Sequence, residues 1–211
     1  MEEHLQMVID TADRILNDHC NHQIVDASES GKFAAELWQN LEQTGLTLAG
    51  IPDSLGGADG TPAHSLCVIR LCGQHAAPVP VAETYVAARL LAASGVGIPA
   101  GPITVARLSA DQQLPLTITN VPFARWCTHF VTVQEEEVTL WDLSENEIIE
   151  HVNIAGEPRD QVVLNGEPIE SARFVGASER LERIGAATRV MLMSGALRGI
   201  LMQSVAYAME R

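Results

Sequence analysis

The residue types that most often do chemistry are spread along this sequence instead of gathering in motifs. No C-x-x-C spacing occurs among the four cysteines, which are Cys20, Cys67, Cys72 and Cys127. Four of the seven histidines, His64, His75, His129 and His151, are scattered along the chain. We therefore predict no metal site. Because a disulfide framework is unusual in a chain this long, we interpret the cysteines as reduced thiols of a cytoplasmic protein.

Two common catalytic motifs are also absent. The sequence has no G-x-S-x-G element of the kind that presents the nucleophile of an α/β-hydrolase. Its glycines at 95, 97 and 101 follow a predicted helix, whereas a dinucleotide-binding loop follows a strand. Serine hydrolase chemistry and a Rossmann site are therefore not expected.

The charge of the chain restricts its partners. The net charge is −14 over 211 residues, and Lys32 is the only lysine. Nucleic acid and anionic membrane surfaces are poor partners for most of such a surface. An anionic ligand would need local arginines or backbone N–H groups.

Neither end of the sequence has the composition of a membrane-directed segment. Acidic Glu2 and Glu3 open the chain and no apolar run follows them, so we expect no signal peptide. The most apolar stretch, 190–209, is interrupted by Arg198 and Gln203, so we also expect no membrane span.

The first half of the chain has helical periodicity. Apolar residues recur at helical spacing in four segments, which cover 3–19, 32–44, 62–73 and 81–94. Thr61-Pro62 fits a helix start, with an N-cap and a proline at the first helical position. The polar stretch 17–31 is expected to connect the first two helices.

After Gly95 the pattern changes to short alternating segments. We predict seven strands, near 103–108, 114–119, 126–133, 137–143, 148–154, 160–164 and 169–174. Asn165-Gly166 is typical of a hairpin turn between the last two, and helical periodicity returns from 178 to 211. The predicted fold is therefore α+β, with an N-terminal helical bundle, a small antiparallel β-domain and a long C-terminal helix.

One stretch carries a resemblance to a known family. Residues 36–57 read ELWQNLEQTGLTLAGIPDSLGG, with the pattern W-x-x-L-x-x-x-G-L followed by I-P-x-x-x-G-G. This pattern resembles the N-terminal helical domain of the acyl-CoA dehydrogenases. GEPRDQVVLNGEPI at 156–169 looks like the family's closing β-hairpin, and SVAYAMER at 204–211 looks like the helix before its aromatic-glycine motif.

The resemblance implies a division of the chain into three parts. We expect an all-helical domain at 1–99, an antiparallel β-domain at 100–177, and the first helix of a C-terminal helical domain at 178–211. The rest of that C-terminal domain lies outside the 211 residues. Whether the reading frame continues past Arg211 would distinguish a truncated enzyme from a shorter partner subunit.

Proteins of this family remove the α-proton of an acyl-CoA with a carboxylate while hydride passes to FAD. The resemblance places no such base on this chain, so no catalytic residue is carried over. Glu179 and Glu182 do not match a base position, and acidic residues are common in a solvated first helical turn. Arg107, Arg125 and Arg159 could contact CoA phosphates, although surface ion pairs are the commoner use of such residues.

The flavin-contacting elements of the family are reduced. Its T-E-P-x-x-G-S-D loop has no counterpart, and residues 105–109 stand in its place. The W-I-T/S element is resembled, without the tryptophan, by Thr117, Ile118, Thr119 and Asn120, our cofactor-binding candidates. Thr119 could present its hydroxyl and backbone N–H to an isoalloxazine ring; the alternative is a strand threonine that faces solvent. Trp126 is expected to pack against the helices.

The predicted function is an acyl-CoA dehydrogenase-like flavoprotein, which oxidises an acyl-CoA thioester at its α,β bond with FAD. As a truncated chain it would be inactive alone and would not retain FAD. The alternative is a non-catalytic partner subunit of a catalytic homologue. Residues 189–211 are apolar on every side of a helix, so we also predict a homo-oligomer, unless this helix folds back onto the N-terminal helices.

Overall fold

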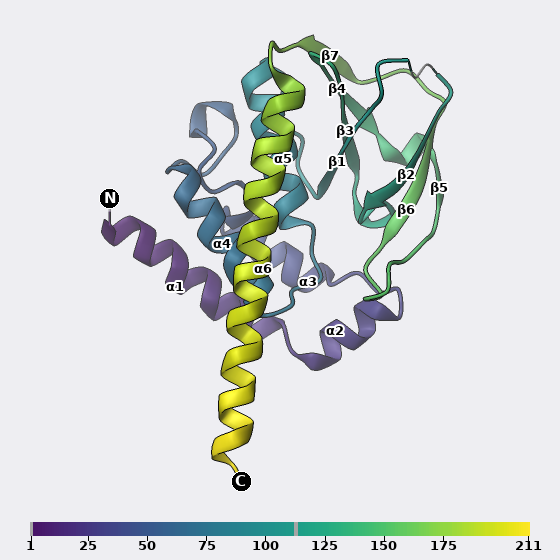
Figure 1. Ribbon diagram of the computed structural model, residues 1–211. Helices are drawn as coiled ribbons and strands as arrows, with labels where there is room; N and C mark the ends of the chain where they lie inside the picture. Colours follow the sequence, from purple (N-terminus) through teal and green to yellow (C-terminus); the bar gives the residue numbers. More distant parts are fainter. Residues whose placement is uncertain (1, 112–113) are drawn as a thin grey trace.

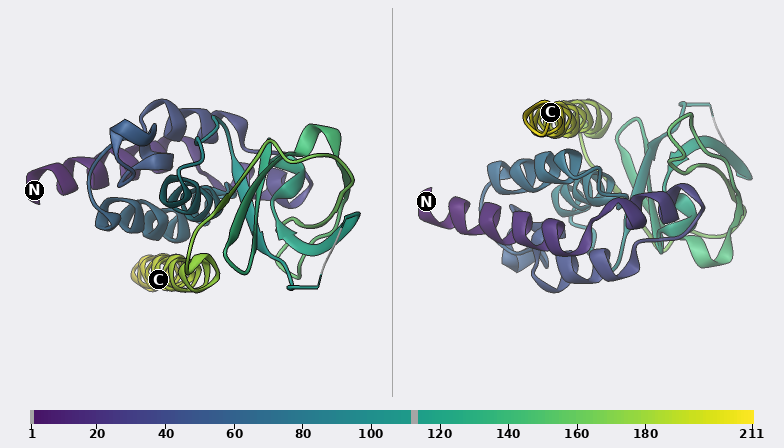
Figure 2. Two further views of the ribbon diagram at one scale, coloured as in Figure 1. Left: turned by 90° about the horizontal axis from the view of Figure 1, so that it is seen from above. Right: turned by 90° about the horizontal axis from the view of Figure 1, so that it is seen from below.

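The chain folds into a helical bundle, a β-domain beside it, and a long helix that runs along both (Figure 1). The computed structural model describes residues 2–111 and 114–211. Seen from above and below, the long helix lies along one side of the bundle, and the β-domain lies beside them (Figure 2). This is the predicted α+β arrangement, and the prediction is confirmed.

Helices α1 to α5 form the bundle. Their bounds are Glu2–His19 for α1, His22–Glu29 for α2, Ala35–Gln43 for α3, Pro62–Gln74 for α4 and Val81–Ser94 for α5. The prediction of a plain connection over 17–31 was wrong, because α2 lies within it. Asn21 starts this short helix, since its side chain accepts a hydrogen bond from the backbone N–H of Ile24 at 3.1 Å.

The 45–57 stretch makes two short 3₁₀ turns that follow α3 and pack on the bundle. Gly56 has a positive φ of 83°, as a sharp change of direction requires. Gly57 does not have a positive φ; it is glycine because a Cβ there would lie 2.1 Å from the carbonyl oxygen of Ile51. The shape of this loop therefore depends on two different properties of its two glycines.

The β-domain contains the seven predicted strands, arranged in two small sheets. They are β1 (Ile103–Arg107), β2 (Leu116–Pro122), β3 (His129–Gln134), β4 (Glu137–Asp142), β5 (Glu147–Ile149), β6 (Arg159–Leu164) and β7 (Glu170–Arg173). The strand orders are β1-β3-β4-β7 and β2-β6-β5. All neighbouring pairs are antiparallel except β1 and β3, which are parallel.

The predicted hairpin between the last two strands was wrong. β6 and β7 belong to different sheets, so the Asn165-Gly166 turn leads from one sheet to the other. β6 pairs instead with β2 and β5. The turn signal was read correctly as a turn, but the choice of strand partner is decided by the packing of the two sheets.

Helix α5 joins the bundle to the β-domain. Its Val86 and Leu90 are buried together with Ile103 of β1, Val131 of β3 and Val138 of β4. The other face of that sheet meets the second sheet in a core around a fully buried phenylalanine, Phe130. Because α5 is buried on nearly every residue of its length, the two regions share one continuous interior.

The long helix α6 (Ala177–Met209) packs closely on α4 and then leaves the rest of the molecule (Figure 1). Three glycines allow the close approach, because a Cβ at Gly73, Gly195 or Gly199 would lie 1.8–2.4 Å from a carbonyl oxygen of the facing helix. Beyond this contact every residue from 200 to 211 is exposed.

By length and hydropathy alone, α6 qualifies as a helix that could cross a membrane. The core helix of a soluble protein meets the same criterion. The expectation of no membrane span therefore stays a prediction.

Candidate functional site

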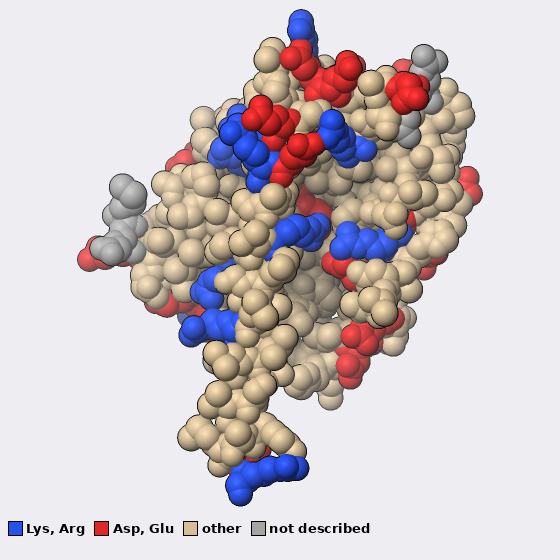
Figure 3. Space-filling model, viewed as in Figure 1, with Lys and Arg blue, Asp and Glu red and all other residues tan. Residues whose placement is uncertain are grey.

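An apolar groove lies where α6 crosses between the bundle and the β-domain. Its volume is about 630 Å³. A space-filling view shows the surface hollowed between α6 and the β-domain (Figure 3). We call it the apolar groove; its lining includes Cys72, Ala77, Pro78, Phe123, Pro158, Leu192, Met193 and Ala196.

One wall of the groove is the α4–α5 turn with the middle of α6. The turn follows α4 because Ala76 adopts a positive φ of 50° and Pro78 cannot continue a helix. A Cβ on Gly73 would lie 2.1 Å from the carbonyl oxygen of Leu192, so α4 and α6 touch at their backbones here. This contact fixes where Leu192, Met193 and Ala196 present their side chains.

The opposite wall comes from the β-domain. Phe123 has a positive φ of 54°, which turns the chain after β2. Its backbone N–H donates to the carbonyl oxygen of Pro158 at 3.2 Å. Trp126 packs against Phe123 on one side and Phe33 of the helical region on the other, with ring centroids 5.9 Å and 5.5 Å apart. The expectation that Trp126 packs against the helical region is thereby confirmed.

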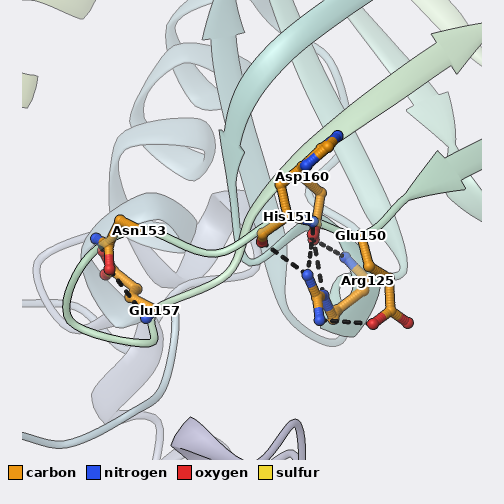
Figure 4. Close-up of polar contacts among 6 residues, drawn as sticks. All are labelled: Arg125, Glu150, His151, Asn153, Glu157 and Asp160. Atoms are coloured by element: carbon orange, nitrogen blue, oxygen red, sulfur yellow. Dashed lines mark hydrogen bonds and ion pairs between the residues drawn. The ribbon is translucent and has the colours of Figure 1, made fainter.

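A buried ion pair holds that wall in place (Figure 4). The Arg125 side chain donates from Nε to Asp160 at 2.9 Å and from Nη1 to Glu150 at 2.7 Å. Asp160 is fully buried, and its second oxygen accepts the backbone N–H of Arg125 at 2.9 Å. Arg125 also donates to the carbonyl oxygen of His151 at 2.7 Å. Because every contact of Asp160 is a hydrogen bond to a cation or N–H group, this carboxylate positions the groove and is not a free base.

The loop that closes the lower edge of the groove is held by its own side chains (Figure 4). Asn153 Oδ1 accepts the backbone N–H groups of Ala155 at 2.9 Å and Glu157 at 3.0 Å. Its Nδ2 donates to the Glu157 carboxylate at 3.0 Å. At Gly156, with a positive φ of 74°, the loop lies against Glu29 of α2. The unpredicted helix α2 therefore supports one edge of the groove.

A second ion pair links α5 to α6 next to the groove. Glu83 is buried and accepts a hydrogen bond from Arg189 of α6. The Glu83 carboxylate raises the pKa of Arg189 above its ordinary value, so the guanidinium stays charged. Burial raises the pKa of the Cys72 thiol to about 12 and that of Cys127 well above its ordinary value, with Glu83 adding to both. These thiols remain protonated and unreactive at neutral pH.

Comparison with known families shows which proteins this chain resembles. Residues 2–96 match the family model described as the acyl-CoA dehydrogenase N-terminal domain. Over these residues the chain is similar to the N-terminal domain of the acyl-CoA dehydrogenases. A comparison with curated proteins finds no match.

Solved structures extend the likeness to the acyl-CoA dehydrogenase fold over the whole chain. A variant of the Tcur3481-Tcur3483 steroid ACAD aligns with 100% of this chain and 68% of its own, at a TM-score of 0.85 and 22% identity. The ChsE4-ChsE5 complex from Mycobacterium tuberculosis aligns with 98% of this chain and 67% of its own, at a TM-score of 0.80 and 22% identity. A glutaryl-CoA dehydrogenase from Mycobacterium smegmatis, in complex with FADH2, aligns with 100% of this chain and 67% of its own, at a TM-score of 0.75 and 12% identity. At these identities the likeness establishes the fold and not a shared activity.

The four cofactor candidates lie on β2, at an edge of the acyl-CoA dehydrogenase-like β-domain. Thr117, Thr119 and Asn120 are exposed, whereas Ile118 is buried in the core between the sheets. Asn120 has a positive φ of 58°, at a break in the register with β6. Within residues 2–111 and 114–211, β2 is an edge strand that pairs with β6.

These residues do not fit a complete FAD. None of them lines the apolar groove or any of four other surface cavities. The arginines proposed for phosphate contacts are held by carboxylates instead: Arg107 by Glu182, Arg125 by Asp160 and Arg159 by Glu157. All three arginines form ion pairs, but the expectation of a surface pair was wrong for Arg125, whose pair with Asp160 is buried. The adenine diphosphate part of FAD has no cationic partner at β2, so we derive no step through flavin.

Glu179 and Glu182, in the first turns of α6, both form ion pairs with arginines. Glu182 pairs with Arg107 of β1, and Glu179 lies 3.7 Å from Arg183 on the same helix. More than half of the side-chain surface is exposed in both glutamates. This is the solvated first helical turn that was expected. No three histidine, cysteine or acidic residues gather to hold a metal ion within residues 2–111 and 114–211.

Proposed function

We propose that this chain binds the acyl part of an acyl-CoA thioester in the apolar groove. The proposal rests on the groove itself, an apolar site of about 630 Å³ between the helical bundle and the β-domain of an acyl-CoA dehydrogenase-like fold. Its volume lies in the range of about 300–1,000 Å³ that small-molecule pockets occupy. Leu192, Met193 and Phe123 would exclude water from an acyl chain, and Glu157 at the edge disfavours an anionic end there.

The reaction that we propose for the bound thioester is its α,β-oxidation by FAD. In our proposal, the α4–α5 turn and the middle of α6 supply one wall of the acyl site, and the β-domain supplies the other. The proposal assigns no base to this chain, and the buried carboxylates Glu83 and Asp160 are both engaged in ion pairs. FAD would supply the hydride acceptor when bound.

A partner subunit is the second candidate. Two of the similar structures are described as a pair of proteins, Tcur3481-Tcur3483 and ChsE4-ChsE5. The exposed end of α6 supports association, because Ile200, Leu201, Val205 and Met209 each expose about half or more of their surface. In this case the chain would bind a catalytic homologue and would itself transfer no hydride.

Calorimetric titration with octanoyl-CoA and with free CoA tests acyl binding. We expect octanoyl-CoA to bind at least about tenfold more tightly, because roughly 0.8 kcal/mol is gained per buried methylene. Ala196→Trp fills the groove and should remove this difference. Ala186→Trp is the matched control, since Ala186 is an exposed residue of α6 that lines none of the five described cavities. Equal affinity for octanoyl-CoA and CoA in the unmodified protein would refute the proposal.

A further inference from the structure

A second cleft lies on the other side of α6, between its first turns, the start of α4 and the middle of α5. Its volume is about 480 Å³. It shares no lining residue with the apolar groove. We call it the arginine cleft, because Arg89, Arg180 and Arg183 all line it. Figure 3 shows basic side chains gathered beside the upper part of α6.

The charge of this cleft is opposite to that of the protein. Three guanidinium groups and one carboxylate, Glu179, line it, which gives a net formal charge of +2, whereas the whole chain carries −14. Arg183 lies 3.7 Å from Glu179. Within the described residues, Arg89 and Arg180 have no carboxylate within 4.0 Å, and the nearest polar contact of Arg89 is the carbonyl oxygen of Gly50 at 3.5 Å.

Helix ends add to this positive potential. Pro62, the first residue of α4, lines the cleft, and so does Gly176, which precedes α6. The amino-terminal ends of both helices therefore face the same space, and each carries a partial positive charge. Anions are stabilised at such ends, and guanidinium groups bind oxyanions through paired N–H donors.

The remaining lining is aromatic and aliphatic. Phe174 lies under the Arg180 guanidinium, with 5.4 Å from Cζ to the ring centroid, which orients the cation over the cleft. Tyr85, Leu66 and Ile184 complete an apolar surface beside the arginines. A ligand that fits both parts has an oxyanion at one end and an apolar or aromatic body.

From this arrangement we infer that the arginine cleft is a binding site for a phosphomonoester with an apolar or aromatic body. A phosphomonoester carries a charge of about −1.5 to −2 at pH 7, which matches the +2 of the cleft better than a single carboxylate does. Arg180 and Arg183 hold the phosphate oxygens, and Tyr85 with Leu66 contacts the body of the ligand. The inference is independent of acyl binding, since the two sites have no residue in common.

Calorimetry with phenyl phosphate tests the site. We expect phenyl phosphate to bind more tightly than inorganic phosphate, because the ring is buried, and more tightly than benzoate, because the charge is larger. Arg180→Gln and Arg183→Gln should each raise the Kd of phenyl phosphate about tenfold, the loss of a charge-assisted contact. Arg198→Gln, which removes an exposed arginine of the same helix outside the cleft, should leave the Kd within about twofold.

Two controls keep the outcome clear. Arg183 is 75% exposed in its side chain, so its replacement leaves the core untouched, and circular dichroism checks that each variant folds. Equal Kd values for Arg183→Gln and Arg198→Gln would overturn the site. Binding of benzyl alcohol or benzoate as tight as that of phenyl phosphate would overturn the assignment to a phosphate.

Discussion

The contact between α4 and α6 leads to a prediction about a single methyl group. Gly195 of α6 faces Arg70 of α4 so closely that a Cβ would lie 1.8 Å from the Arg70 carbonyl oxygen. To reach 3.4 Å, where ordinary van der Waals contact begins, the two backbones must separate by the difference, about 1.6 Å. Both partners are backbone atoms in helices, so no side chain can rotate to make room.

We therefore expect Gly195→Ala to destabilise the protein. Separation of α4 and α6 would loosen the partly buried Ile184, Met191 and Leu192, which pack on the bundle core. Overpacking of this kind costs about 1–3 kcal/mol. The helix gains about 1 kcal/mol from alanine in place of glycine, so a matched control is needed to separate the two effects.

Gly185→Ala provides that control. Gly185 lies in the same helix, and a Cβ there would meet nothing within 4 Å. Its replacement should stabilise the protein by about 0.5–1 kcal/mol through helix propensity alone. Urea unfolding followed by circular dichroism gives both free energies, and Gly195→Ala should lie about 1–3 kcal/mol below Gly185→Ala. If the two variants are equally stable, the α4–α6 contact does not depend on the missing methyl group.

Three further predictions concern the loop, the cofactor and the assembly. Gly57→Val should lower the free energy of unfolding by roughly 1–3 kcal/mol, because its Cβ would lie 2.1 Å from the Ile51 carbonyl oxygen; an unchanged melting temperature would contradict this. The purified chain should carry no stoichiometric FAD, and a flavin band near about 450 nm at one flavin per chain would refute the poor fit at β2. Since burying each exposed apolar side chain of α6 gains roughly 1.5–3 kcal/mol, we expect self-association at micromolar concentration. Sedimentation equilibrium would contradict it by showing only a 22.7 kDa species.

Much of the fold was predictable because its signals are local. The strand 116–122 was expected at 114–119. Buried and exposed side chains alternate in it as predicted, with Thr117 and Thr119 exposed on either side of the buried Ile118. The helix start at Thr61 was also correct, and there the His64 side chain completes a capping box with Thr61. Each of these patterns spans only a few consecutive residues, so the local sequence contains the whole signal.

The features that sequence analysis missed depend on residues far apart in the chain. Gly73 is needed because Leu192 passes it, and nothing near Gly73 in the sequence indicates that neighbour. The apolar groove combines the α2 region, the α4–α5 turn, residues 155–158 and α6, so no single motif could reveal it. Helix α2 was missed because it is eight residues long and its polar composition resembles a loop.

Photolabelling tests the acyl site most directly. An acyl-CoA with a diazirine at the end of its acyl chain would be irradiated with the protein, and the labelled peptides identified by mass spectrometry. Acyl binding in the apolar groove predicts labels on residues 192–196 or 155–158, and an excess of unlabelled octanoyl-CoA should suppress them. Labels that lie only outside these segments, or that octanoyl-CoA does not suppress, would contradict the proposal that this groove binds the acyl group.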